Sequence, residues 1–166
     1  MEERVMNGYR RAFLGVALAG VVLIGAAAPV LAADSRDMGP RPSKPEDPDY
    51  TAGMKAIDSG NFLAAIPLLE RVVGRDDGNA DAYNSLAYAI RKSGDPARAI
   101  PIYQKALAID PKHRSAHEYI GEAYLELNDV ARAREHLAAL DRLCFLPCSP
   151  YRDLKKAIET YQARGR

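Results

Sequence analysis

The stretch that decides the fold is "ADAYNSLAYAIRKSGDPARAIPIYQKALAIDP", residues 80–111. Its apolar residues recur at three- and four-residue spacing, which is the period of an amphipathic helix. Gly94 and Asp95 interrupt this pattern, and Pro96 follows where the first turn of a new helix tolerates a missing N–H group. Pro111 ends the second run because proline cannot continue a helix. The stretch therefore predicts two helices joined by a tight turn.

The same pattern occurs again on both sides of this stretch at a spacing of about 34 residues. The framework positions of the central copy are Tyr83, Leu86, Ala87, Ile90, Gly94, Ala99, Tyr103, Ala106 and Pro111. The following copy places His117, Ile120, Gly121, Tyr124, Asn128, Ala133, Leu137, Leu140 and Phe145 there. The preceding copy is weaker and has Asp49, Ala52, Gly53, Ala56, Gly60, Ala65, Leu69, Val72 and Asp77. These residues and their period resemble the tetratricopeptide repeat family.

The resemblance implies an all-α fold, a right-handed superhelix of three helix-turn-helix repeats followed by a capping helix. We expect a degenerate first repeat at 49–78, a second at 79–112 and a third at 113–145. Residues 146–166 then form a corner and a cap, with Ser149 as N-cap and a helix over 150–163. Such an extension with two cysteines resembles that of small exported bacterial proteins of this family.

Residues 1–32 have the three regions of a secretory signal: a basic start, an apolar run and a small-residue end. Arg10 and Arg11, followed by Phe13 and Leu14, resemble a twin-arginine motif, and an ordinary Sec signal is the alternative. We expect a cleaved signal and a periplasmic mature chain that does not span the membrane, or else an uncleaved inner-membrane anchor. Residues 33–48 carry four prolines and predict a disordered linker.

The composition and motifs favour a binding module over an enzyme. The formal net charge is only +1, which gives no overall field to attract nucleic acid. We find no nucleophile elbow and no phosphate loop, and we expect no catalytic residue, cofactor or metal. His113 and His117 are one helical turn apart, but no glutamate stands where a zinc protease needs one. We therefore interpret His117 as a packed imidazole at an aromatic position of its repeat.

The two cysteines, Cys144 and Cys148, are four residues apart at the end of a predicted helix. The helix dipole opposes a thiolate there, which disfavours a redox pair. In an exported chain, two otherwise unpaired thiols are expected to form a disulfide, and we predict that it fixes the corner before the cap. A thiol- or metal-handling protein and a self-associating envelope structural protein remain alternative functions.

In the family that the repeats resemble, ligands bind in a groove lined by the first helix of each pair. The predicted groove residues are Met54, Asn84, Ser85, Tyr88, Arg91, Lys92, Glu118, Tyr119, Glu122 and Glu126. Tyr50, Met54, Ser115 and Tyr119 occupy the positions of the family's carboxylate clamp, so a chaperone C-terminus is not expected as the ligand.

The predicted groove is basic in the second repeat, with Arg91 and Lys92, and acidic in the third. The three glutamates of the third repeat recur at four-residue spacing, and such like charges weaken their own helix slightly. They indicate either a surface that binds a basic ligand or a solvated face whose negative charge is offset by Lys and Arg of the next helix. Tyr88 and Tyr119 are expected to lie near each other as anchors for an extended peptide. The sequence thus predicts a non-catalytic protein-interaction module whose partner offers a peptide or helix.

Overall fold

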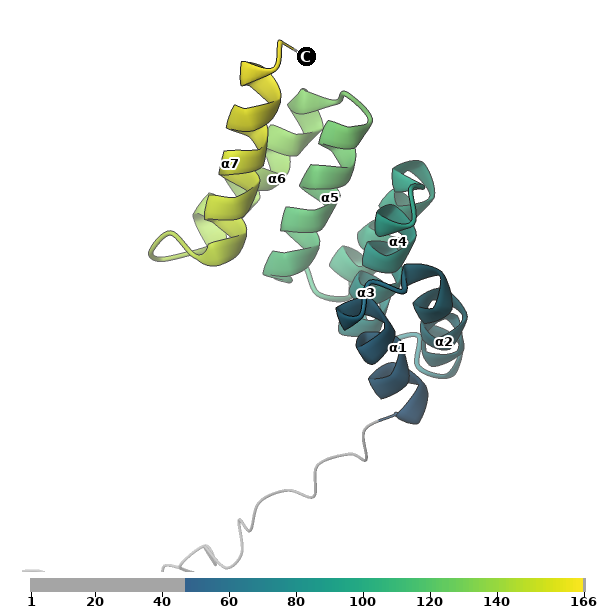
Figure 1. Cartoon of the computed structure of the whole chain (residues 1–166). Helices are drawn as coiled ribbons and strands as arrows, with labels where there is room; N and C mark the ends of the chain where they lie inside the picture. Colours follow the sequence, from purple (N-terminus) through teal and green to yellow (C-terminus); the bar gives the residue numbers. More distant parts are fainter. Residues whose placement is uncertain (1–46, 166) are drawn as a thin grey trace, which may run out of the picture. The chain divides into compact units, whose positions relative to one another are not determined.

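The computed structural model describes residues 47–165, which form seven α-helices and no strand (Figure 1). The helices are α1 (Pro48–Asp58), α2 (Phe62–Arg75), α3 (Ala80–Lys92), α4 (Pro96–Ile109), α5 (Arg114–Glu126), α6 (Val130–Leu143) and α7 (Ser149–Ala163). They pack as the pairs α1–α2, α3–α4 and α5–α6, each pair against the next, and α7 packs on α5 and α6. The all-α superhelical repeat fold expected from the sequence is confirmed.

The predicted signal and most of the predicted linker lie outside the described residues. The last two residues assigned to that linker belong to α1 instead: Asp47 is its N-cap, and Pro48 is its first residue. The Asp47 side chain accepts hydrogen bonds from the backbone N–H groups of Asp49 and Tyr50. None of the helices in the described range is long and apolar enough to cross a bilayer.

The turn inside each helix pair is repeated residue for residue. Gly60, Gly94 and Asn128 all adopt positive φ, at 74°, 101° and 63°. Glycine takes this left-handed conformation without a steric cost, and asparagine is among the few other residues that take it readily. The second helix then begins with an N-cap whose side chain accepts an N–H, as Asp95 and Asp129 do in the second and third pairs. The local chemistry of the turn therefore sets the repeat.

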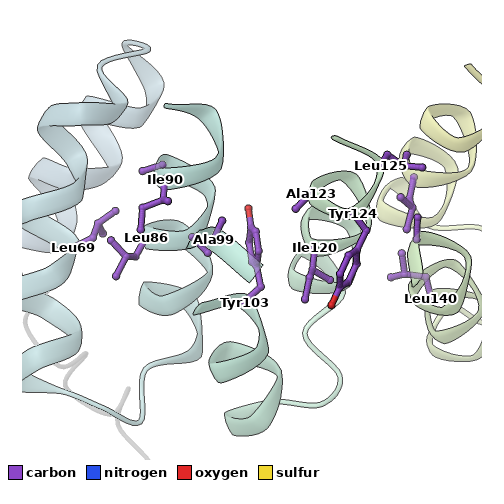
Figure 2. Packing of buried hydrophobic residues seen from close by; sticks show 14 of the residues in the cluster. Leu69, Leu86, Ile90, Ala99, Tyr103, Ile120, Ala123, Tyr124, Leu125 and Leu140 are labelled. Carbon is purple, nitrogen blue, oxygen red and sulfur yellow. The ribbon is translucent and has the colours of Figure 1, made fainter. Parts of the chain in front are cut away.

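The core runs through all of the pairs as one continuous cluster of buried side chains (Figure 2). Its largest fully buried members are Tyr103, Leu69, Ile90, Ile120, Leu140 and Leu154. Ala65, Ala99 and Ala133 occupy equivalent positions in the three second helices and are 0% exposed. Such small side chains permit the two helices of a pair to pack closely.

The capping helix closes the last pair through Leu154 and Ile158, which join the core cluster. A Cβ atom added at Gly121 of α5 would lie 2.6 Å from Cδ2 of Leu154, so α7 approaches α5 as closely as a glycine permits. The Tyr161 hydroxyl donates to Asn128 Oδ1 at 2.9 Å and links the cap to the turn of the third pair.

The corner between α6 and α7 differs in detail from the prediction. Ser149 is the first residue of α7 rather than its N-cap, which is Cys148, and no side chain caps this helix. Instead, the Ser149 hydroxyl accepts a hydrogen bond from Arg152 at 3.1 Å. Cys144 and Cys148 form a disulfide pair with their Cα atoms 5.8 Å apart. Between them Phe145 is fully exposed at 101% of its reference area.

Candidate functional site

The first helices of the three pairs form a common face, which we call the α1–α3–α5 face. It holds a cavity of about 280 Å³ to which all three helices contribute. The cavity is lined by Met54, Ile57, Asp58, Asn84, Ser85, Tyr88, Ser115 and Tyr119. Five of the ten predicted groove residues are therefore brought together in one hollow; they are Met54, Asn84, Ser85, Tyr88 and Tyr119.

A second cavity, of about 530 Å³, lies between α3, α5 and the capping helix. Its lining includes three more predicted residues, Arg91, Glu122 and Glu126. Sequence reasoning missed the wall from α7, which consists of Asp153, Lys156, Ala157, Thr160, Tyr161 and Arg164. These residues recur at three- and four-residue spacing along α7. That spacing marks them as one face of α7 and was the available signal.

Arg91 lines the larger cavity and is the most buried charge of the site, with a side chain only 5% exposed. Its two terminal nitrogens lie 2.6 Å from Glu122 Oε2 and 2.6 Å from Glu126 Oε1. Its guanidinium carbon also lies 5.6 Å from the ring centroid of Tyr88 and 5.8 Å from that of Tyr119. Two carboxylates and two aromatic rings therefore enclose one cation.

The balance of forces on Arg91 favours its charged form. Burial works against the charge, but Tyr103, Glu122 and Glu126 outweigh it and hold the pKa of Arg91 above its ordinary value. The cation that pairs with Glu122 and Glu126 is Arg91 of α3, in the preceding pair, and not a residue of the next helix. Lys92, the next residue, is exposed at the end of α3 and lies outside both cavity linings.

The predicted closeness of Tyr88 and Tyr119 is confirmed, with ring centroids 4.9 Å apart. Phe62 of α2 packs against Tyr88 at 6.1 Å, and Tyr103 of α4 packs against Tyr119 at 6.4 Å. Tyr103 is completely buried, and this burial raises the pKa of its hydroxyl. The two cavity-lining rings thus rest on a second layer of aromatic side chains, which fixes their orientation.

Two polar side chains that belong to this face, Asn84 and Glu118, lack partners among the described residues, and the buried hydroxyl of Tyr103 behind them lacks one too. Asn84 is 8% exposed, and its buried Oδ1 accepts no hydrogen bond. Glu118 is 9% exposed and makes no hydrogen bond or ion pair there. Burial first, and then the charges of Glu122 and Asp153, raise the pKa of Glu118 to about 7, while Arg91 opposes them. Buried polar groups are normally paired, so each of these two requires an explanation.

The histidines form two separate arrangements. His113 caps α5 by accepting the Ala116 N–H at its Nδ1, and its Nε2 lies 3.0 Å from Asp81. His117 turns instead to His136, with their Nδ1 atoms 2.9 Å apart, and is a half-buried, packed imidazole. Burial, followed by the charge of His117, lowers the pKa of His136 to about 4. Among residues 47–165, no three His, Cys, Asp or Glu side chains converge as a metal site.

Comparisons with known proteins agree with this architecture. Two models described as tetratricopeptide repeat match residues 50–114 and 91–143. Cellulose synthase operon protein C of Escherichia coli strain K12 is 38% identical over 68 residues, which are 39% of this chain and 6% of that protein. The chain therefore corresponds to a small part of this curated relative.

Solved structures show the same fold. MamA from Desulfovibrio magneticus RS-1, from residue 41 to its end, superposes with a TM-score of 0.56 and 27% identity. The match covers 57% of this chain and 54% of that one. PcrH in complex with the chaperone binding region of PopD gives a TM-score of 0.63 at 17% identity, over 71% of this chain and 91% of that one.

Proposed function

This chain belongs to the tetratricopeptide repeat family, and we propose that it is a non-catalytic protein-interaction module. In this proposal, the α1–α3–α5 face binds an extended peptide or a helix of a partner protein. PcrH, which has a similar fold, is seen bound to a segment of PopD. That precedent supports a polypeptide as the ligand class.

The observation that carries the proposal is the buried, unpaired Oδ1 of Asn84, a residue that lines the smaller cavity. Leaving a buried acceptor without a donor costs about 1–3 kcal/mol, so the folded chain bears this cost until a ligand supplies an N–H. A peptide backbone offers such a donor at every residue other than proline. Tyr88 and Tyr119 lie in the same lining and supply apolar area with a polar tip, which suits them to anchor the ligand.

The proposed site of action is the bacterial periplasm, reached after removal of residues 1–32. The support is the signal pattern of the sequence together with the pair Cys144–Cys148, since disulfides persist in oxidising compartments. Retention of the signal as an inner-membrane anchor is the alternative form. The groove chemistry is the same in both cases.

A photo-crosslinking residue at Met54, which lines the smaller cavity, tests the groove in intact cells. We expect a crosslinked partner from Met54 and none from the same probe at Ala108, an exposed residue of α4. Adding Asn84→Leu should abolish the Met54 crosslink while leaving the protein at least as stable, because it removes an unpaired buried acceptor. Equal crosslinking from both positions, or an undiminished crosslink in the Asn84→Leu protein, contradicts the proposal.

A further inference from the structure

Glu118 of α5 lies along its helix between residues that line the two cavities, and it belongs to neither lining. It is one helical turn from Ser115, which lines the smaller cavity, and one turn from Glu122, which lines the larger. At 9% exposure, it has been withdrawn from water without gaining a hydrogen bond or an ion pair from the described residues. A buried carboxylate in such a position calls for a positive partner.

The charged groups around Glu118 do not provide that partner. Glu122 of its own helix and Asp153 of α7 are negative. Arg91 of α3 is positive, but its terminal nitrogens already lie 2.6 Å from Glu122 and from Glu126. Lys156 of α7 lines the larger cavity but makes no ion pair among the described residues. Burial first, and then the negative charges of Glu122 and Asp153, raise the pKa of Glu118 to about 7.

The larger cavity has a mixed lining, with Arg91, Lys156 and Arg164 as its cations and Glu122, Glu126 and Asp153 as its carboxylates. Leu125 and Ala157 provide apolar surface for the methylene stem of a long basic side chain, while Glu122 and Asp153 provide carboxylates. The acidic groups do not converge as metal ligands in the described part of the chain, which separates this arrangement from a cation site for a metal. Asn84, in the neighbouring cavity, offers an acceptor for the backbone of the same ligand.

We propose that Glu118, with Glu122 and Asp153, forms an anionic subsite that receives an arginine or lysine side chain of the bound peptide. This inference rests on the proposed function and specifies the chemistry of the partner. The incoming cation takes the place of the proton that Glu118 otherwise retains near neutral pH. Specificity then arises because a neutral side chain would leave the carboxylate buried and unpaired.

The test compares two immobilised nonapeptide libraries, degenerate except for a central arginine in one and its neutral isostere citrulline in the other. At pH 8, we expect the purified protein to bind the arginine library about tenfold better, since a charge-assisted hydrogen bond supplies discrimination of this order. Glu118→Gln should bring the ratio close to one. Glu159→Gln, an equal change of net charge on the exposed side of α7, should leave the ratio unchanged.

Lowering the pH to about 5.5 should also reduce the ratio for the unaltered protein, because Glu118, with its raised pKa, becomes protonated. If both libraries bind equally well to the unaltered protein, the subsite is wrong and groove binding stands. A ratio that survives in Glu118→Gln also overturns the subsite. If neither library binds, the proposed function fails and the inference fails with it.

Discussion

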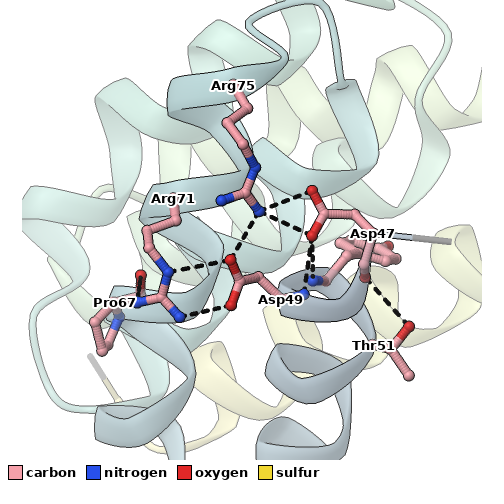
Figure 3. A network of polar contacts seen from close by, with 7 residues as sticks. Asp47, Asp49, Thr51, Pro67, Arg71 and Arg75 are labelled. Carbon is pink, nitrogen blue, oxygen red and sulfur yellow. Dashed lines mark hydrogen bonds and ion pairs between the residues drawn. The ribbon is translucent and has the colours of Figure 1, made fainter.

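The molecule contains two arginine–carboxylate networks of nearly equal geometry and very different surroundings. At the N-terminal end, Arg71 and Arg75 of α2 hold Asp47 and Asp49 at distances of 2.6–2.8 Å (Figure 3). Further along, Arg91 holds two glutamates at 2.6 Å. The side chains of Arg71 and Arg75 are 51% and 49% exposed, whereas that of Arg91 is 5% exposed. Burial rather than distance distinguishes what the two networks do.

The networks also join different parts of the fold. The N-terminal one links the start of α1 to α2 within a single pair (Figure 3). The network of Arg91 spans two successive pairs, because Arg91 lies on α3 and its carboxylates lie on α5. Only the second network therefore fixes the spacing of the helices that form the proposed groove.

Replacing Arg91 with alanine should have the largest effect on the free energy of unfolding. Breaking a fully buried pair costs about 3–5 kcal/mol, and we expect about 3 kcal/mol because Glu122 and Glu126 retain some contact with water. The loss includes the packing of the guanidinium against the rings of Tyr88 and Tyr119. Urea denaturation followed by circular dichroism measures it.

A charge-free version of the same network separates the loss of a cation from the loss of the network. Arg91→Met combined with Glu122→Gln and Glu126→Gln should recover most of the stability lost in Arg91→Ala. Buried ion pairs exchanged as a set for neutral residues of similar size are often close to neutral. A triple variant as unstable as Arg91→Ala would show that packing, and not charge, explains the effect.

The Cys144–Cys148 disulfide is a covalent link in the C-terminal half. Its contribution to stability can be compared with that of the Arg91 network. Replacing both residues with serine should lower the free energy of unfolding by about 2 kcal/mol, which is the chain-entropy value for so short a loop. Melting temperatures of the oxidised and reduced protein provide the comparison, with the double serine variant as control. If reduction does not change the melting temperature, the predicted fixing of the corner by the disulfide is wrong.

Glu118 differs from the carboxylates of both networks because it is buried and forms no ion pair with an arginine. Its folded pKa of about 7 lies above the reference value of 4.5, so the folded state binds this proton more tightly than the unfolded state. Its contribution is therefore present in acid and is lost as the pH rises from about 4.5 to about 7. Glu118→Gln should stabilise the protein by about 1–2 kcal/mol at pH 8 and by almost nothing at pH 4. An equal effect at both pH values would contradict this account.

The sequence predicted the repeated turns and the meeting of the groove tyrosines because both follow from the repeat itself. Gly60, Gly94 and Asn128 stand at equivalent positions, and so do the helices that carry Tyr88 and Tyr119. The repeat pattern does not predict the partners of a single charged side chain. Arg91 and Lys92 are adjacent residues, yet a rotation of about 100° around α3 buries one and leaves the other in water.

The contribution of α7 to the larger cavity could not be predicted for a related reason. The capping helix is not a repeat, so its angle to α5 depends on tertiary packing, in particular on Leu154 against Gly121. Lys156 of this helix lines the cavity because the packing of α7 turns its side of the helix toward α3 and α5.

The N-terminal network should show the smallest effect of all. Replacing Arg71 and Arg75 together with alanine should leave the melting temperature nearly unchanged at 0.15 M salt, since exposed ion pairs are screened by water and ions. The melting temperature of this double variant should fall below that of the unaltered protein only at low salt. The loss of stability in Arg91→Ala should persist at 0.5 M salt. Arg71, followed by Arg75, lowers the pKa of Asp49 to about 2, so any stabilisation is present above pH 4 and disappears as the pH falls toward 2. A large, salt-resistant loss in the double variant would mean that exposure does not distinguish the two networks.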